Sequence, residues 1–248
     1  MKYTRYESDF ESDGERATAT DYVKQIKEQG KGHFNSKESL LSWYFSECHP
    51  RVKLPSLAFL IEYINKKGAK KILSLGAGPC SIEHLLKMCI PADCEVTATD
   101  FNPYQIERAK EFFPNIEAKV FDFTKDDVNK LGSSFDLVVF FDSSYSMNDS
   151  EFIHLIDGLR NLGIKHIIDF GGCLSLRRIP KLIIEQSWCN LKSRLISNEL
   201  PKGRIRGYVR SKGERRRLYQ KAGLQVVENA GIENYDYAIF VLNVNYSD

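Results

Sequence analysis

From Lys70 onward the chain alternates short strand-like runs with helix-like segments, and this alternation restricts the fold more than any other feature of the sequence. Several runs, such as those at 71–75 and 136–141, are almost continuously apolar. Such runs are typical of parallel strands that helices cover on both faces. The five strand-like runs are Lys71–Leu75, Glu95–Thr99, Glu117–Phe121, Asp136–Phe141 and His166–Phe170. We therefore expect a doubly wound sheet.

The segments between these runs carry the signals of helix starts. Asn102-Pro103, for example, joins a capping side chain to a proline at the first helical position. Later, Ser211 and Glu214 form a capping box that opens a short helix. Two further strand-like runs follow, Leu224–Val227 and Tyr237–Val244. The sequence therefore predicts the α/β class, with a doubly wound, mostly parallel seven-stranded sheet that has a C-terminal antiparallel hairpin strand.

The region before the alternation predicts helices only. Three are expected there: 21–29, a helix from the Asn35-Ser36 cap through Trp43, and one from a first turn at Pro55 to a stop at Gly68. We expect residues 1–67 to form an N-terminal helical cover or lid. Residues 68–248 should form one compact catalytic unit, with an insertion at 174–210 on its substrate side.

The composition is that of an ordinary globular protein, with 42% hydrophobic and 27% charged residues and a formal net charge of +2 in 248 residues. No apolar run approaches the roughly 20 residues that a membrane-spanning helix needs. The first residues lack the apolar core of a secretory signal. None of the six cysteines forms a Cys-x-x-Cys pair, so we expect free, buried thiols. These features predict a cytoplasmic protein that does not enter a membrane.

The first strand runs directly into Gly76-Ala77-Gly78, and a helix is expected from about Ser81. Glycines let a ligand approach the backbone closely, and a helix N-terminus offers free amides. The next strand ends at Asp100, 22 residues after Gly78, where a carboxylate can bind both hydroxyls of a ribose. The third is followed by Asp122-Phe123, an acid and a ring suited to adenine. Acids at successive carboxyl ends of parallel strands indicate a nucleoside-type cofactor.

This layout and these residues together resemble the class I S-adenosylmethionine-dependent methyltransferases, over residues 70–244. The resemblance implies that the glycine loop runs past the methionine part of S-adenosylmethionine and that Asp100 takes the ribose hydroxyls. It also implies that the segment after the fourth strand lies beside the transferred methyl group. The cofactor-binding residues that it implies are Gly76, Ala77, Gly78, Asp100, Phe101, Asp122, Phe123, Phe141, Asp142 and Ser143.

The chain departs from the family at one position. The family usually has an acid two residues before the first glycine, where this chain has Ser74. That acid normally organises the loop and the cofactor's amino group. We take Asp142 as the first candidate to replace it.

A nicotinamide-dependent dehydrogenase is an alternative, because dinucleotide-binding folds also have a glycine loop after the first strand. The motif from Gly76 to Ser81 lacks the third glycine of the dinucleotide fingerprint. The pair Tyr63 and Lys67 precedes the first strand, where it cannot serve a downstream site in the usual manner. The terminal strand pair also fits a dehydrogenase poorly. We therefore prefer methyl transfer.

Methyl transfer is an in-line displacement at a sulfonium methyl group, so the enzyme must mainly hold the acceptor in line. An oxygen or ammonium acceptor also needs a base. We take Asp142 and Tyr145 as the catalytic candidates. His33 and His49, which lie in the expected cover, are more typical of surface or packing residues.

Two more specific chemistries are alternatives at this position. The segment Asp142-Ser143-Ser144-Tyr145 shares its first and last residues with the Asp-Pro-Pro-Tyr motif of methyltransferases that act on amino groups of nucleic acids or glutamine amides. It lacks both prolines, so an RNA or protein amide N-methyltransferase is the alternative rather than the main reading. Asp142 and Asp169 could together resemble a metal-dependent methyltransferase, but Phe170 stands where that group has asparagine. We expect no metal.

The stretch from 174 to 221 carries fourteen basic and three acidic residues, a formal charge of +11 against −9 for the rest of the chain. Such asymmetry indicates an anionic partner. A small anionic acceptor would need converging arginines, for which we name Arg177, Arg206 and Arg210. RNA would use the whole stretch, with Trp188, Tyr208 and Tyr219 as stacking rings. No RNA-binding module accompanies it, so we prefer the small molecule.

The sequence thus predicts a methyltransferase that uses S-adenosylmethionine and acts on oxygen or nitrogen of a small, anionic acceptor. A catalytically silent, methyltransferase-like binding or scaffold protein is the alternative from another class. The acceptor, its reacting atom and the oligomeric state do not follow from the sequence.

Overall fold

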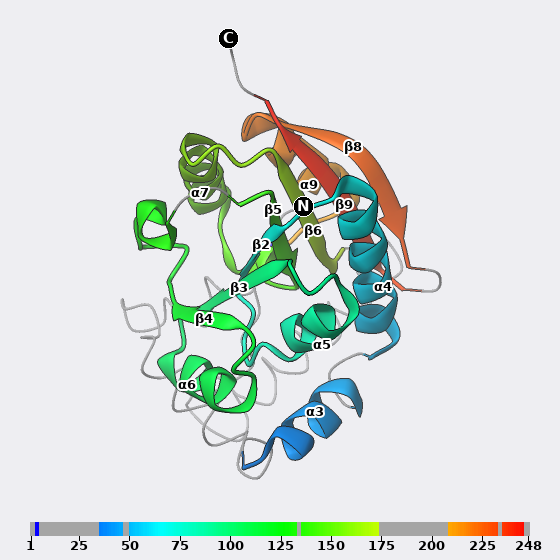
Figure 1. Ribbon diagram of the computed structural model, residues 1–248. Helices are drawn as coiled ribbons and strands as arrows, with labels where there is room; N and C mark the ends of the chain where they lie inside the picture. Colours follow the sequence, from blue (N-terminus) through cyan, green and yellow to red (C-terminus); the bar gives the residue numbers. More distant parts are fainter. Residues whose placement is uncertain are drawn as a thin grey trace, which may run out of the picture.

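The computed structural model describes residues 3–4, 35–46, 50–132, 135–173, 208–232 and 235–245. Its main sheet has seven strands in the order β4-β3-β2-β5-β6-β9-β8 (Figure 1). The first five strands in this order are parallel, and β9 pairs antiparallel with both β6 and β8. The predicted α/β fold with a reversed terminal hairpin is therefore confirmed.

Buried apolar runs set the strands, which are β2 (Lys71–Leu75), β3 (Glu95–Asp100), β4 (Glu117–Val120), β5 (Leu137–Phe141), β6 (His166–Gly172), β8 (Leu224–Gly231) and β9 (Tyr237–Val244). The prediction ended β8 at Val227, four residues too early. The reason is that β8 is an edge strand with mostly exposed or half-buried side chains and an irregularity between Val226 and Glu228. A second, unpredicted sheet pairs β1 (Tyr3–Thr4) with β7 (Tyr208–Val209).

The described helices are α3 (Lys37–Ser46), α4 (Pro50–Lys67), α5 (Ser81–Cys89), α6 (Pro103–Phe112), α7 (Asp149–Asn161) and α9 (Lys212–Lys221), with short 3₁₀ turns η1 (Val128–Leu131) and η2 (Ser144–Ser146). The predicted caps are confirmed, because Asn102 accepts from the N–H of Tyr104 and Ser211 forms its capping box with Glu214. The start of α4 was predicted wrongly. The helix begins at Pro50 rather than at Pro55, which lies inside it.

Pro55 has no N–H, so it cannot donate to the carbonyl of Arg51 one turn earlier, yet the helix continues through it. The buried face runs from Val52 before this proline to Leu60 and Ile64 after it. The expected helix at 21–29 lies outside the described residues. A lid role for residues 1–67 stays a prediction.

Helices cover both faces of the sheet (Figure 1). On one face, α7 and α9 pack their side chains, such as Phe152 and Tyr219, against Phe140 of β5 and Phe240 of β9. On the other face, α4 and α5 pack against β2, β5, β6 and β9. Helices α3 and α6 enclose a third cluster beside the start of α5. This packing leaves the loops at the carboxyl ends of the parallel strands as the place where polar groups gather.

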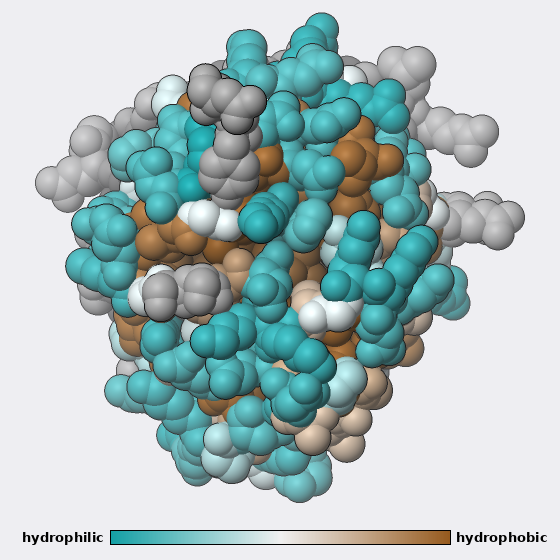
Figure 2. Space-filling model, turned by 45° about the horizontal axis from the view of Figure 1, so that its top comes forward, coloured by the Kyte–Doolittle hydropathy of each residue, from teal (hydrophilic) through white to brown (hydrophobic). Residues whose placement is uncertain are grey.

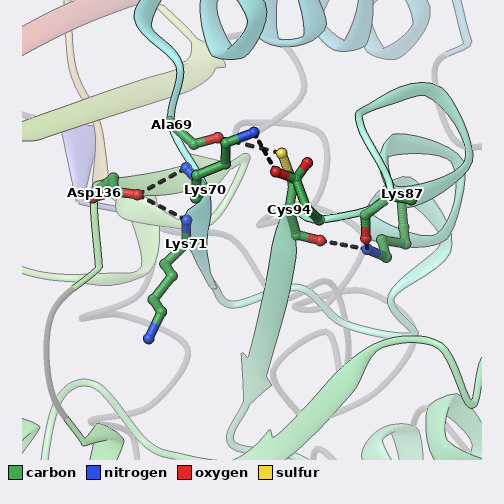
Figure 3. A network of polar contacts seen from close by, with 8 residues as sticks. Ala69, Lys70, Lys71, Lys87, Cys94 and Asp136 are labelled. Atoms are coloured by element: carbon green, nitrogen blue, oxygen red, sulfur yellow. Dashed lines mark hydrogen bonds and ion pairs between the residues drawn. The ribbon is translucent and has the colours of Figure 1, made fainter.

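The amino ends of β2, β3 and β5 are tied together at the opposite edge (Figure 3). The Asp136 carboxylate accepts hydrogen bonds from the backbone N–H groups of Lys70 and Lys71, at 2.8 and 2.9 Å. The Lys87 ammonium donates to the carbonyl of Cys94, and the Cys94 thiol reaches the carbonyl of Ala69. These contacts fix the register of the strands away from the loops where a ligand is expected.

The surface at the amino edge is largely hydrophilic, with hydrophobic residues in patches between hydrophilic ones (Figure 2). Within the described ranges, no helix combines the length and the apolar character needed to cross a membrane. The four cysteines in those ranges have free thiols, as expected. Cys80, Cys94 and Cys173 are buried, but Cys89 at the end of α5 is exposed, contrary to the prediction.

Replacing Asp136 by alanine should lower the free energy of unfolding by about 1–2 kcal/mol, because two backbone donors lose their charged acceptor. Urea denaturation measures the change. Asp93 is the control, since its exposed ion pair with Lys70 belongs to the same network but holds no backbone N–H of β2. Asp93→Ala should change stability little. Equal losses in the two variants would contradict this account.

Candidate functional site

The loops that follow β2, β4 and β5 touch at the carboxyl edge of the sheet. Gly76 has a left-handed backbone with φ of +72°, and a Cβ atom there would lie 2.5 Å from Ser143 Cβ and 3.1 Å from Phe123 Cε1. Only glycine fits this position without displacing its neighbours. Gly76, Phe123 and Ser143, which were predicted to bind the cofactor and follow three different strands, are therefore in close contact.

The glycine loop is held by hydrogen bonds to neighbouring strands. The N–H of Ala77 donates to the carbonyl of Thr99 at 2.8 Å, and the Ser143 hydroxyl donates to the carbonyl of Leu75. Gly78 and Cys80 both have φ of 57°, so the chain turns sharply before α5 begins. The loop is thus fixed in shape between β3 and the end of β5.

Asp100 joins the glycine loop to the end of β3. Its side chain is only 6% exposed, and its two carboxylate oxygens accept hydrogen bonds from the N–H groups of Gly78 and Asn102, each at 2.9 Å. Burial raises the pKa of Asp100 to about 6, against the effect of these hydrogen bonds. Each oxygen keeps a second lone pair, so the carboxylate can still accept hydroxyl donors.

The other predicted adenine-side residues have local partners. Asp122 closes its own turn, because one carboxylate oxygen accepts from the N–H and hydroxyl of Thr124 at 3.0 and 2.6 Å and the other pairs with Lys125 at 3.3 Å. The Phe141 ring stacks on Phe170 with centroids 4.3 Å apart. Phe101 follows β3 directly and is half-buried. Their contacts with a cofactor stay predictions.

Asp142 and Tyr145 lie together after β5. Asp142 has a left-handed backbone with φ of 50°, which is uncommon for a residue with a Cβ. Burial raises the pKa of Asp142, and the positive charge of Lys53 opposes the shift. Burial also raises the pKa of Tyr145 to about 12, and the negative charges of Asp142 and Asp100 add to the shift. At neutral pH the Tyr145 hydroxyl is therefore protonated and can donate a hydrogen bond. Asp142 is a carboxyl group whose ionised form, which Lys53 favours, can accept a proton.

Sequence reasoning missed Glu83, which lies in the first turn of α5. The Ser74 hydroxyl donates to Glu83 Oε1 at 2.6 Å, and the glutamate side chain is 1% exposed. Burial raises the pKa of Glu83 to about 7, while the hydrogen bond from Ser74 opposes the shift. Glu83 lies one turn from Leu86 on the buried face of α5, and an acid on an apolar helix face was the signal that could have found it.

The prediction placed Asp169 at the carboxyl end of the strand His166–Phe170. This was wrong, because β6 continues to Gly172. The Asp169 carboxylate is instead the centre of a buried network with Ser144 at 2.7 and 2.9 Å, Tyr219 at 2.6 Å and Arg215 at 3.3 Å. Tyr219 is fully buried there, so it is not an exposed ring on which a base could stack. In the part of the chain that the structure describes, no group of three or more His, Cys, Asp or Glu side chains could hold a metal ion.

Arg210, a predicted acceptor-binding residue, is 5% exposed and already has partners. Its guanidinium pairs with Asp149 at 2.9 Å and donates to the carbonyl of Met147, also at 2.9 Å. This ion pair neutralises its charge and ties β7 to the start of α7. The predicted residues Arg177, Arg206, Trp188, His33 and His49 lie outside the described residues.

Replacing Gly76 by alanine should destabilise the protein more than the same change at Gly163. Both glycines have positive φ, at +72° and +79°, so each alanine costs about 1–2 kcal/mol for its backbone alone. A Cβ at Gly163 meets nothing within 4 Å, whereas the one at Gly76 meets Ser143. Urea denaturation should show an extra loss of about 1–3 kcal/mol for Gly76→Ala. Similar losses would mean that the loop is not closely packed.

The buried acids should make stability depend on pH. Glu83 and Asp100 have pKa values of about 7 and about 6 in the folded protein, both above their ordinary values. The folded state therefore binds protons more tightly, and stability present at low pH is lost as pH rises through this range, by on the order of 1–3 kcal/mol for each acid. Glu83→Gln should flatten the decline between pH 5 and 8 in urea denaturation.

Glu117 provides the control for this experiment. Hydrogen bonds with Lys119 and Thr97 lower its pKa, so Glu117→Gln should leave the slope between pH 5 and 8 unchanged. Asp100 keeps part of the decline in Glu83→Gln, because its pKa of about 6 lies in the same range. A slope as steep as that of the unchanged protein would contradict the assignment of proton uptake to Glu83.

No protein-family model matches the chain, and no curated protein sequence matches it. Solved structures do. The magnesium protoporphyrin IX methyltransferase ChlM of Synechocystis PCC 6803, solved with bound SAH, has a TM-score of 0.59 at 13% identity, covering 92% of this chain and 100% of that one. The PH0226 protein of Pyrococcus horikoshii OT3 has a TM-score of 0.60 at 21% identity, covering 91% and 99%.

Other matched structures are named as S-adenosylmethionine-dependent or O-methyltransferases. One from Rhodobacter sphaeroides, provisionally described as a Zn-dependent alcohol dehydrogenase, has a TM-score of 0.55 at 14% identity and covers 72% of this chain and 85% of that one. At these identities the likeness concerns the fold. The strand order, the antiparallel β9 and these structures agree: the chain has the Rossmann-like fold of the class I methyltransferases.

Proposed function

We propose that this protein is an S-adenosylmethionine-dependent methyltransferase that acts on oxygen or nitrogen of a small, anionic acceptor. The observation that carries the proposal is the meeting of Gly76, Phe123 and Ser143 at the carboxyl edge, with Asp100 bound to the same loop. A glycine loop without room for a Cβ and an acid at the end of the next strand are the parts that a nucleoside cofactor needs.

The charge of the site suits this cofactor. Two buried acids, Glu83 and Asp100, and the half-buried Asp142 lie around the glycine loop, and desolvation raises the pKa of each. A ligand with a sulfonium and an ammonium group would stabilise their ionised forms. Asp100 would hold the ribose, and the loop from Gly76 to Gly78 would lie against the methionine part. When bound, the cofactor supplies an electrophilic methyl group.

The protein's own contribution is to place and deprotonate the acceptor. Tyr145 donates a hydrogen bond that orients the acceptor, because its raised pKa keeps the hydroxyl protonated. Asp142 accepts the proton that an oxygen or ammonium acceptor must lose, and its raised pKa makes it a better base than an exposed aspartate. The positive charge of Lys53 opposes this rise in pKa and so favours the ionised form of Asp142 that accepts the proton.

The amide or amino alternative is less well supported by the geometry. It requires an acceptor beside Asp142 for the target amino group, and the carbonyl of Ser143 is the nearest in sequence. That carbonyl already accepts from the hydroxyl and the N–H of Ser146, at 2.7 and 3.0 Å. Both of its lone pairs are therefore in use.

An anionic acceptor is inferred from the basic stretch of residues 174–221. Since Arg210 and Arg215 each have a carboxylate partner within the protein, they contribute little free positive charge. Arg177 and Arg206 are therefore the arginines that we propose for the acceptor.

Calorimetric titration tests the cofactor first. S-adenosylmethionine and S-adenosylhomocysteine should bind with micromolar affinity, while NADH should not. Asp100→Asn should weaken both by at least about tenfold, because the charge that holds the ribose hydroxyls is lost; tenfold corresponds to about 1.4 kcal/mol. Asp136→Asn at the opposite edge should bind both as well as the unchanged protein.

Each contrary result has a clear meaning. If NADH alone binds, the proposal of methyl transfer is wrong and a redox function takes its place. Unchanged affinity in Asp100→Asn would remove Asp100 from the site. Binding of S-adenosylmethionine without turnover of any anionic acceptor in a broad panel would favour the catalytically silent binding protein.

A further inference from the structure

Glu83 has a carboxylate oxygen that lacks a donor. Its Oε1 accepts from Ser74, but Oε2 is buried and has no hydrogen-bond partner among the described residues. A buried polar atom without a partner costs free energy, so Oε2 calls for a group that satisfies it. For the ionised carboxylate the missing group is a hydrogen-bond donor, and a cation suits it best because it also favours that ionised form.

A buried cation lies close by. Lys53 of α4 is 9% exposed, and its ammonium lies over the ring of Tyr44 of α3, 3.5 Å from the ring centroid. Its positive charge lowers the pKa of both Glu83 and Asp142, so it lies within electrostatic reach of both. A buried lysine is uncommon and must be compensated by negative charge.

Together the two side chains offer one negative and one positive group close to the glycine loop. Ser74, which holds Glu83, precedes Gly76 by two residues on the same strand. An α-amino acid has the complementary pair: an ammonium that donates and a carboxylate that accepts. The methionine part of S-adenosylmethionine ends in such a group.

We propose that Glu83 and Lys53 bind the α-amino-acid end of the cofactor, with Glu83 replacing the strand acid whose position Ser74 occupies. The inference rests on the proposed function. In this chain the carboxylate comes from the first turn of α5 instead of the strand, and the Ser74 hydroxyl donates a hydrogen bond to it. Lys53 links the same end of the ligand to α4, in the segment predicted as a cover.

The test compares two ligands that differ only at this end. S-adenosylhomocysteine carries the amino-acid group, whereas 5′-methylthioadenosine has the same adenosine and thioether without it. Glu83→Gln should weaken S-adenosylhomocysteine at least tenfold in calorimetric titration and leave 5′-methylthioadenosine unchanged. Lys53→Met should show the same selectivity. Asp100→Asn is the control and should weaken both ligands.

Moving the acid back to the strand gives an independent check. The double variant Ser74→Asp/Glu83→Ala should bind S-adenosylhomocysteine at least tenfold more tightly than Glu83→Ala alone. Near-ultraviolet circular dichroism and thermal unfolding verify that each variant is folded. This rescue would not occur if Glu83 only filled space beneath the loop.

The outcomes separate the inference from the function on which it rests. If the unchanged protein binds neither ligand, both the proposed function and this inference are overturned. If it binds both ligands and Glu83→Gln weakens them equally, Glu83 has a structural role and the inference alone is overturned. Unchanged affinity of Glu83→Gln for S-adenosylhomocysteine overturns it as well.

Discussion

The site depends on the two hydrogen bonds that the Asp100 carboxylate accepts from the backbone. One comes from Gly78 in the glycine loop and the other from Asn102, which caps α6. A single buried side chain thus fixes the loop after β2, the end of β3 and the start of the next helix in one arrangement. Because backbone donors hold the carboxylate, its position is set before any ligand arrives, which lowers the entropy cost of binding.

The buried charges follow a common logic. Glu83, Asp100 and Asp142 all have raised pKa values because burial disfavours their ionised forms, and Lys53 is the cation that opposes this effect at two of them. Such acids reduce stability at neutral pH. A cationic ligand would recover that loss on binding. The contrasting case is Asp169, whose charge is fully satisfied by Arg215, Tyr219 and Ser144 and which therefore serves the fold.

Most of the fold could be predicted from sequence because its signals are local. The ends of β2 and β9 were predicted correctly, since both are runs of buried side chains. The half-exposed edge strand β8 gives no such run, and a proline inside α4 looked like a helix start. Glu83 and Lys53 were missed for a different reason. The sequence places Glu83 on an apolar helix face but does not link it with Lys53, because only the packing of α4 on α5 brings the two helices together.

The position of β9 has a consequence for how the chain is made. The strand lies between β6 and β8, yet it follows β6 in sequence only after residues 173–236. While these residues are being synthesised, β6 presents an open edge of unpaired backbone groups, beside the buried Asp169 that still lacks Arg215 and Tyr219 of α9. Exposed edges of this kind are where nascent chains pair wrongly. The nascent protein should therefore be most prone to aggregation and most dependent on chaperones during that interval on the ribosome.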